Sequence, residues 1–198
     1  MPDARLLTRA DIGAASQTLA AAFADDPVWQ YLAPSRARWR RHAARIFAAD
    51  ISNRLGHGHV YATEGMESIA VWSPPDTWEH GLIQLLREGP AAARLFSTGA
   101  LRAVRYQSSL ERAHPRPSHY YLAILGTAPE HQGHGFASKA LAPVLRRCDE
   151  EGMPAYLESS KEQNLAFYAR HRFVGDERLE VLSGAPPVWP MWREPAAS

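Results

Sequence analysis

The order of its elements predicts an α/β layered fold for this chain, and three observations in the last third carry the prediction. The stretch "HYYLAILGT" (119–127) is apolar over the length of a strand, and a glycine loop joins it to a helical pattern that ends near Glu151. "PAYLESS" predicts a second strand and "KEQNLAFYARHRF" a second helix. "VGDERLEVL" and "PPVWPMWRE" predict two further strands. Strands that alternate with helices in this way favour a sheet covered by helices.

The earlier part of the chain predicts mostly helices, with one hairpin between them. Thr8 is a suitable N-cap for the first helix, and Asp25, Asp26 and Pro27 end it. The remaining elements are a short strand over 4–7, a helix over 36–54, hairpin strands over 60–63 and 68–72, and a helical segment over 76–107 with breaks at Gly89–Pro90 and near Gly99.

Composition and charge argue against several classes of protein. The 198 residues suit one domain, and 45% hydrophobic and 22% charged residues are typical of a globular protein with a core. A net charge of +1 favours neither a nucleic-acid nor a membrane partner, and the basic run 35–45 is typical of the solvated face of a helix. The chain has no apolar stretch of membrane-spanning length, and its first residues do not form a signal peptide, so a cytoplasmic location is expected.

Cysteine and histidine usage predicts neither a disulfide nor a metal site. Cys148 is the single cysteine, lies within a predicted helix and has no base-like neighbour, so it is interpreted as a structural thiol in a reducing compartment. The nine histidines show no ligand-like spacing with cysteine or with paired carboxylates, and we therefore expect no metal.

The glycine loop "LGTAPEHQGHGFASKAL" (125–141) is the strongest functional signal. Gly133 and Gly135 stand between a strand and a helix, where bare backbone lets an anion approach the unpaired N–H groups that begin the helix. The loop lacks the lysine of a Walker loop. A dinucleotide fingerprint is a weak match, because Ser138 occupies the place of the third glycine and the loop comes late in the chain.

The loop and its surroundings resemble those of the GNAT N-acetyltransferase superfamily. Residues 132–137, "QGHGFA", preceded by Pro129, match the pattern Q-x-x-G-x-[GA] of that family. A strand follows, and then a helix with Asn164 and Tyr168, in the order seen in the family. "TLAAAFADDP" and the "AVW-x-x-P" hairpin are similar to the puromycin N-acetyltransferase branch. The motifs cover about 118–192, and weaker similarity covers most of the rest.

This resemblance implies a fold and an activity. It implies one GNAT-like domain over 1–198, with acceptor-side elements in about 1–117 and an acetyl-CoA-binding half in about 118–198. The central sheet would be mixed, mostly antiparallel, splayed between its fourth and fifth strands and flanked by helices. The activity implied is transfer of the acetyl group of acetyl-CoA to a primary amine of a small molecule in a ternary complex. A non-catalytic acetyl-CoA-binding regulatory module and a protein or peptide N-acetyltransferase remain open, and the apolar last strand would allow a homodimer.

The resemblance also implies which residues hold acetyl-CoA, the co-substrate. Backbone groups of Leu125, Gly126 and Thr127 would pair with the pantetheine arm, and Asn164 and Tyr168 would contact it from the next helix. Loop N–H groups would hold the pyrophosphate, and the residues concerned are Gln132, Gly133, His134, Gly135, Phe136 and Ala137. The sequence departs from the family at Phe136, where an aliphatic residue is common.

Three residues are candidates for proton transfer. Tyr168 would protonate the departing CoA sulfur, and its alternative role is to pack in the core. Glu158 ends a predicted strand and would take the amine proton, or else is a carboxylate exposed at the strand end. His119 shares a strand face with Tyr121 by period-two spacing and is a second candidate for the base.

Acceptor recognition is expected at the turn between the first two helices. Acidic and aromatic side chains gather there and suit a cationic amine through charge pairing and cation–π contact. Each of them could equally be a helix cap or a hydrophobic anchor. The candidates are Phe23, Asp26, Trp29 and Tyr31, with Trp72 of the hairpin as a further wall.

Overall fold

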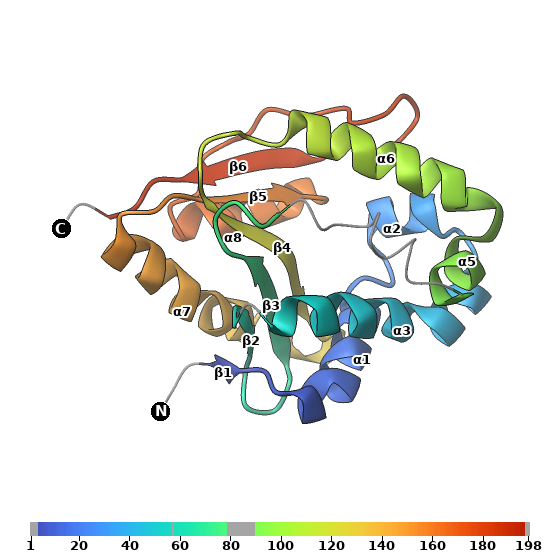
Figure 1. Cartoon of the computed structure of the whole chain (residues 1–198), viewed down its shortest axis with the longest axis horizontal. Helices are drawn as coiled ribbons and strands as arrows, with labels where there is room; N and C mark the ends of the chain where they lie inside the picture. The colour runs from blue at the N-terminus through green and yellow to red at the C-terminus, as the bar shows by residue number, and fades with distance from the viewer. Residues whose placement is uncertain (1–3, 57, 79–89, 197–198) are drawn as a thin grey trace.

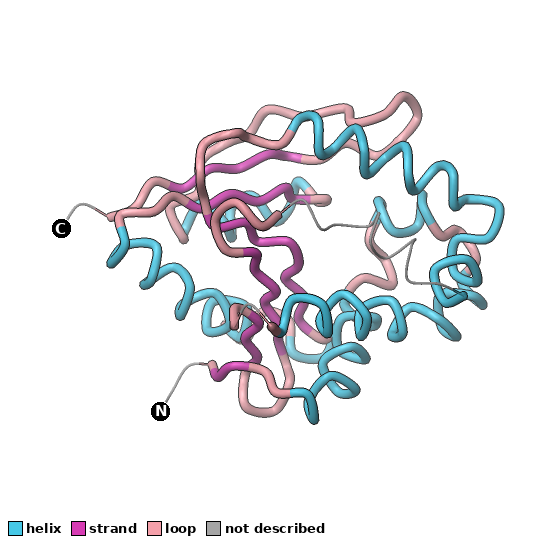
Figure 2. The backbone as a smooth tube through the Cα atoms, viewed as in Figure 1, coloured by secondary structure: helices cyan, strands magenta, loops and turns pink. Residues whose placement is uncertain are grey.

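The computed structural model describes residues 4–56, 58–78 and 90–196, which form a six-stranded sheet flanked by helices (Figures 1 and 2). The strands follow one another in the sheet in chain order, from β1 to β6. Their bounds are Arg5–Leu6 for β1, Val60–Ala62 for β2, Ser68–Ser73 for β3, Tyr120–Thr127 for β4, Ala155–Ser159 for β5 and Trp189–Arg193 for β6.

The sheet is mixed and opens between its fourth and fifth strands, as the family resemblance implies. All neighbouring strands are antiparallel except β4 and β5, which are parallel. These two strands pair only where Tyr120 lies opposite Ala155 and Tyr121 opposite Tyr156. Residues 122–127 of β4 therefore keep β3 as their sheet partner and leave their other backbone edge open toward β5.

A β-bulge lies at the point where the sheet opens. Val71 pairs with Ile124, whereas Trp72 pairs with Leu122, so Ala123 is an extra residue in β4. A bulge bends its strand and turns the local backbone away from the regular ladder. The bulge therefore lies in the part of β4 where this strand diverges from β5.

Helices cover both faces of the sheet (Figure 1). The long helix α7 packs on β2, β3 and β4, while α1 and α3 pack on the opposite face, where α1 reaches β3 and β4. Residues of β3 alternate between the two cores, since Ile69 and Val71 belong to the α1–α3 core and Ala70 and Trp72 to the α7 core. The helix bounds are Ile12–Ala22 for α1, Pro27–Leu32 for α2, Arg36–Leu55 for α3, Pro90–Phe96 for α5, Ala100–Ala113 for α6, Phe136–Glu151 for α7 and Leu165–Arg170 for α8.

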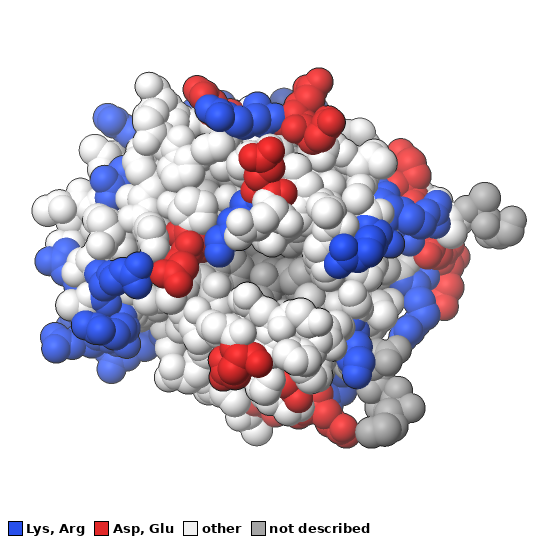
Figure 3. Space-filling model, turned by 180° about the vertical axis from the view of Figure 1, so that it is seen from behind, with Lys and Arg blue, Asp and Glu red and all other residues white. Residues whose placement is uncertain are grey.

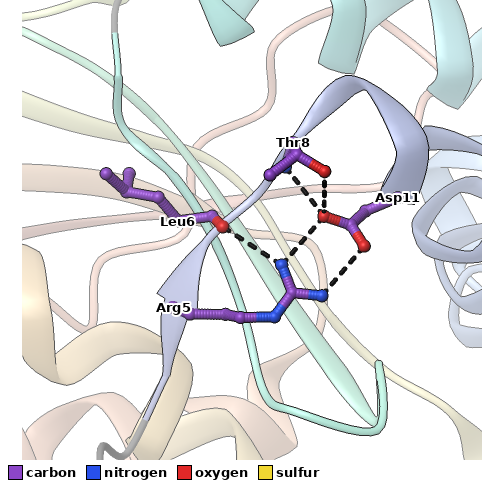
Figure 4. A network of polar contacts seen from close by, with 4 residues as sticks. All are labelled: Arg5, Leu6, Thr8 and Asp11. Atoms are coloured by element: carbon purple, nitrogen blue, oxygen red, sulfur yellow. Dashed lines mark hydrogen bonds and ion pairs between the residues drawn. The ribbon is translucent and has the colours of Figure 1, made fainter.

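The entry to the first helix is fixed by a local polar network (Figure 4). Both oxygens of Asp11 accept hydrogen bonds of 2.8 Å from the Arg5 guanidinium, and the Thr8 backbone and hydroxyl donate to the same carboxylate. These donors lower the pKa of Asp11. The network joins β1 to a capping box at Thr8, which is the N-cap of the 3₁₀ turn Arg9–Asp11 that leads directly into α1.

Two predicted elements differ from the structure. The strand expected in "VGDERLEVL" is wrong: this segment makes isolated bridges through Val174 and Leu179, and Gly175 passes so close to Pro190 that a Cβ would lie 2.3 Å from its carbonyl oxygen. The second difference is α2, for which the sequence predicts no helix. The sequence pattern predicts that Asp26 and Pro27 end a helix, but they begin the next one, with Asp26 as its N-cap.

Three further predictions, on the segment 76–107, the basic run and membrane-spanning helices, can be compared with the structure. Part of the expected 76–107 segment, residues 79–89, lies outside the described residues. The basic run 35–45 comprises the N-cap and the first half of α3, and the arginines of this run are exposed. Figure 3 shows charged side chains of both signs around a hollow on the rear face. Within the described residues, no helix has the length and apolarity that crossing a membrane requires.

Candidate active site

Two cavities meet where the sheet opens. The first, called here the inner cavity, has a volume of about 170 Å³ and lies among α2, α3, α6 and the sheet. The second, called the splay groove, has a volume of about 510 Å³ and runs along β4, the glycine loop, the start of α7, and α8. Six residues line both: Phe23, Asp26, Ala123, Ile124, Glu158 and Ser160. A molecule in one cavity can therefore touch a molecule in the other.

Backbone forms one wall of the splay groove. Leu125, Gly126 and Thr127, which the family resemblance implies as co-substrate-binding residues, all line it. A Cβ on Gly126 would lie 2.7 Å from Leu19 and 3.2 Å from Phe23, so this glycine lets α1 approach β4 closely. The open strand edge thus stays next to a rigid helix.

The glycine loop ends the groove with a helix start that no side chain caps. Gly133 and Gly135 have φ of +79° and +81°, and a Cβ on either would meet nothing within 4 Å. Gly135 is the N-cap of α7, so the first N–H groups of that helix have no capping side chain. The residues of the predicted loop set that line the groove are Gln132, Gly133, Gly135, Phe136 and Ala137. The exposed His134 is not among the described lining residues, and its Nδ1 lies 2.9 Å from the Gln132 carbonyl.

Tyr168 and Asn164 both line the groove. Asn164 precedes α8, and Tyr168 is buried within α8 against the ring edges of Phe167 and Phe173. Burial and the charge of Asp26 raise the pKa of Tyr168. The phenol therefore stays protonated at neutral pH and can donate a hydrogen bond or a proton.

Glu158 lies at the junction of the two cavities. It is part of β5, and its side chain is 5% exposed. Its Oε1 has no hydrogen-bond partner among the described residues, and the Nδ1 atom of His114 lies 3.5 Å away. Burial and this carboxylate raise the pKa values of Tyr121 and Tyr156. A buried carboxylate oxygen without a donor is costly, and it is suited to receive a proton or an ammonium group.

His119 lies beside this junction but is not among the described residues that line either cavity. Its Nδ1 is 2.6 Å from the carbonyl oxygen of Pro117, and its Nε2 is 3.0 Å from Nε2 of His114. It is 1% exposed, and burial lowers its pKa. His114 therefore lies between His119 and Glu158 and links the two side chains.

Three of the expected acceptor residues, Phe23, Asp26 and Trp29, line the inner cavity. Oδ1 of Asp26 accepts 3.0 Å hydrogen bonds from the backbone N–H groups of Val28 and Trp29, and Oδ2 accepts one from the hydroxyl of Ser160. Burial raises the pKa of Asp26. This carboxylate is thus engaged as a helix cap and as a link between α2 and the chain after β5.

Tyr31 and Trp72 are not among the described residues that line the inner cavity. The Tyr31 ring packs near Tyr106, with the Arg102 guanidinium 4.8 Å from its centre. Trp72 is fully buried on the face of β3 that α7 covers, whereas the inner cavity lies toward α3. Neighbouring residues of a strand point to opposite faces of the sheet, and Trp72 follows Val71, which faces the α1–α3 core. The Trp72 side chain therefore points away from the cavity.

Several residues of the inner cavity are not among the candidates that the sequence predicts. His114, Tyr106 and Tyr121 line it, as do Asp50 and Arg54, which form a buried ion pair of 3.1 Å. The two residues are spaced i, i+4 on α3, and this spacing is only a weak signal for a buried polar site, because such pairs also stabilise exposed helix faces. His114 follows α6 in a proline-rich turn, where no local pattern predicts which cavity its ring will border.

Within the described ranges, no group of three or more His, Cys, Asp or Glu side chains could hold a metal ion. The residues around both cavities instead offer backbone N–H groups, phenols, carboxylates and imidazoles. The groove therefore has the features expected for an extended anionic ligand, and the inner cavity those expected for a compact one.

Comparison with known proteins identifies the family. The model of the acetyltransferase (GNAT) family matches residues 21–173. An uncharacterized N-acetyltransferase of Schizosaccharomyces pombe is 28% identical over 200 aligned residues, which cover 93% of this chain and 80% of that protein.

Solved structures share the fold. A Corynebacterium glutamicum protein described as "histone acetyltransferase HPA2 and related acetyltransferase" superposes with a TM-score of 0.70 at 22% identity, over 98% of this chain and 97% of that one. An agmatine N-acetyltransferase gives a TM-score of 0.56 at 13% identity, over 96% and 98% of the two chains.

The chain therefore belongs to the GNAT acetyltransferase family. It is an acetyl-CoA-dependent acyltransferase, as members of this family are. This assignment favours catalysis over the alternative of a purely regulatory acetyl-CoA-binding module. The comparisons are with the family as a whole, so the puromycin N-acetyltransferase branch stays a prediction.

Proposed function

We propose that this protein transfers the acetyl group of acetyl-CoA directly to a primary amine of a small molecule, with both substrates bound at once. One observation carries the proposal: Oε1 of Glu158, which no described residue hydrogen-bonds, lies at the junction of the inner cavity and the splay groove. Direct transfer requires that the two substrates meet beside a base, and this junction supplies both conditions.

In the proposed complex, acetyl-CoA occupies the splay groove. The open edge of β4 at 125–127 pairs with the pantetheine arm, the N–H groups at the start of α7 hold the pyrophosphate, and Asn164 contacts the arm from the far side. When bound, acetyl-CoA supplies an activated thioester carbonyl. A backbone N–H of the same β4 segment stabilises the negative charge that develops on that oxygen.

Proton transfer is assigned to two residues that line the groove, Glu158 of β5 and Tyr168 of α8. Glu158 accepts a proton from the acceptor nitrogen, because an ammonium group has no lone pair with which to attack. Tyr168 donates its phenolic proton to the departing sulfur, and its raised pKa supports the protonated state that this role needs. His119 does not contact the cavities directly, and we assign it a positioning role that is developed below.

The inner cavity indicates the kind of amine. Its walls include the aromatic rings of Phe23, Trp29, Phe47 and Tyr106, and the carboxylate of Glu158 lies at the end where it joins the groove. An amine with a compact apolar or aromatic body would bury that body among these rings and direct its nitrogen to Glu158.

A protein or peptide acceptor is the second candidate. It is favoured by the solved structure with the TM-score of 0.70, whose description names a histone acetyltransferase. The small size of the inner cavity, about 170 Å³, suits a compact amine better than a folded chain. A lysine side chain alone would nevertheless fit such a space.

The test is release of free CoA thiol from acetyl-CoA with a panel of amines that includes arylalkylamines, agmatine, puromycin and a lysine-containing peptide. We expect amine-dependent release, highest for a small amine with an apolar body, and a large fall in Tyr168→Phe with unchanged acetyl-CoA affinity. Higher kcat/KM for the peptide would replace the small-molecule proposal with the second candidate. Acetyl-CoA binding without release for any amine would contradict both.

A further inference from the structure

We propose that His114 relays the proton that Glu158 takes from the acceptor amine to an outer pocket, and that His119 positions His114 for this transfer. The inference rests on the proposed function, in which Glu158 is the base. It concerns a separate step, which is the removal of the proton from a buried site after Glu158 has accepted it.

The overall reaction makes such an exit necessary. An acceptor that arrives as an ammonium ion loses two protons before it becomes an amide. One proton ends on the sulfur of CoA, by way of Tyr168, and the other is released to solvent. The side chain of Glu158 is 5% exposed, so the released proton needs a path from its carboxyl group.

His114 is the nitrogen base that borders Glu158. Its Nδ1 lies 3.5 Å from Oε1 of Glu158, the same oxygen that has no hydrogen-bond partner among the described residues. The His114 ring is held by stacking on Trp78, with ring centres 3.8 Å apart, and by the edge of Tyr121, 4.8 Å away. The ring is therefore fixed with one nitrogen toward the carboxylate.

The contacts of His119 define which nitrogen of His114 is free to accept a proton. A backbone carbonyl can only accept a hydrogen bond, so Nδ1 of His119, 2.6 Å from the Pro117 oxygen, carries a proton. Burial lowers the pKa of His119, which keeps that ring neutral and leaves its Nε2 as an acceptor. Nε2 of His114, 3.0 Å away, must then be the donor. The remaining lone pair of neutral His114 is on Nδ1, which faces Glu158.

His114 also connects the junction to the outside. Besides lining the inner cavity, it lines an outer pocket over the end of α6, together with Trp78 and Glu111. Ser108, Arg112 and Arg116 complete that pocket. His114 thus takes the proton from the protonated Glu158 on Nδ1, becomes an imidazolium, and returns to neutral when water of the outer pocket removes the proton.

The other titratable groups that face His114 do not compete for this role. Tyr121 of β4 and Tyr156 of β5 contact its ring by their edges, and burial and Glu158 raise the pKa values of both phenols. They stay protonated in the neutral range. Glu111 of α6 lines the outer pocket and is a suitable first acceptor near water.

The first test removes the imidazole and then returns it in solution. We expect His114→Ala to lower kcat by about 100-fold, the usual scale for a lost proton-transfer group, with acceptor KM and acetyl-CoA affinity within about threefold of the wild type. Added imidazole should restore kcat in proportion to its concentration, and substituted imidazoles should do so according to their pKa values. A folded variant with unchanged kcat, or a loss that no imidazole restores, would overturn the relay.

The second test separates positioning from packing at His119. His119→Gln retains an acceptor for the N–H of His114, whereas His119→Leu fills the space without one. We expect kcat to fall about tenfold in the leucine variant, with a shifted acidic limb of the pH profile, and to stay near the wild-type value in the glutamine variant. Equal losses in the two variants would show a packing role and contradict the positioning role.

Two further variants distinguish failure of the relay from failure of the proposed function. His42 of α3 is also a buried histidine, but it is not among the described residues lining either cavity, so His42→Gln should keep wild-type kcat and ignore imidazole. If Glu158→Gln is fully active, the assignment of the base fails and the relay fails with it. If Glu158→Gln loses activity while His114→Ala keeps it, the relay alone is wrong.

Discussion

The splay groove and the inner cavity meet at one junction, yet the chain builds them in different ways. The groove is made largely of backbone: an open strand edge, two glycines with positive φ and an uncapped helix start. Its main parts lie within 122–170, and many are close in sequence. The inner cavity is made of side chains from α2, α3, α6, β4 and β5, which are far apart in the chain. The site proposed for the co-substrate is thus built from backbone groups that are close in sequence. The site proposed for the acceptor is built from side chains that tertiary packing brings together.

The largest expected effect lies at the junction itself. We expect Glu158→Gln to lower kcat by about 100-fold, because the amide cannot take the acceptor proton, and to leave acetyl-CoA affinity unchanged. Steady-state kinetics with a separate binding titration of acetyl-CoA measure the two quantities. Weakened acetyl-CoA binding with normal kcat would mean that Glu158 belongs to the groove rather than to the chemistry.

The same contrast explains what could be predicted from the sequence. The glycine loop and the order of strand, loop and helix are predicted from the sequence, because these features are local, whereas the splay and the roles of Asn164 and Tyr168 are implied by the resemblance to the GNAT superfamily. The extra residue at Ala123 and the border position of His114 depend on how β3, α6 and β5 pack against one another. No pattern within one segment contains that information.

Trp72 and Asp26 illustrate why the contacts of a single side chain are hard to predict from the sequence. Trp72 was expected to face the acceptor, but the face of a strand that meets a given helix is decided by the register of the whole sheet. Asp26 was placed near the acceptor site because it is acidic, and it does line the inner cavity. Its oxygens, however, are engaged by Val28, Trp29 and Ser160, and Ser160 lies 134 positions away in the sequence.

The next prediction concerns the wall that the groove shares with α1. Gly126→Ala would place a Cβ 2.7 Å from Leu19 and 3.1 Å from Ala22, so the helix must shift. We expect a loss of about 1–3 kcal/mol in the free energy of unfolding, as overpacking usually causes, measured by urea denaturation. Gly13→Ala within α1 is the control, because its Cβ would meet nothing within 4 Å. Equal stability of the two variants would show that α1 moves freely on β4.

A smaller effect is expected for Gly135→Ala, which tests the backbone character of the groove. The residue has φ of +81°, and left-handed backbone costs a non-glycine residue about 1–2 kcal/mol. If the loop leaves this conformation, the N–H groups at the start of α7 lose their alignment, and acetyl-CoA affinity should fall about tenfold with unchanged acceptor KM.

The matched control is Gly152→Ala at the opposite end of the same helix. Gly152 has φ of +64° and equally open surroundings, so it carries the same backbone cost without bordering the groove. Both variants should lose similar stability in thermal unfolding. Only Gly135→Ala should lose acetyl-CoA affinity in a binding titration, and equal affinities for the two variants would contradict the assignment of the loop to the pyrophosphate.

The smallest effect is expected from the Asp11 network, which is as local as the loop but lies away from both cavities. Because Arg5 and Thr8 lower the folded-state pKa of Asp11, its contribution to stability is fully present above the unfolded value of about 3.9 and is lost as pH falls below it. Asp11→Asn should therefore lower Tm slightly at pH 7, and the difference from the wild type should shrink at pH 3, while kcat and both KM values stay unchanged.

Asp25→Asn supplies the comparison for this last variant. Asp25 pairs with Arg36 at 3.1 Å, but both side chains are more than 70% exposed, so solvent screens the pair and Tm should not change. If Asp11→Asn also left Tm unchanged at pH 7, the network would add no more than an exposed ion pair. If instead it changed the kinetics, the entry to α1 would be coupled to the groove through Gly126, and local backbone would influence catalysis beyond the segment that forms the groove.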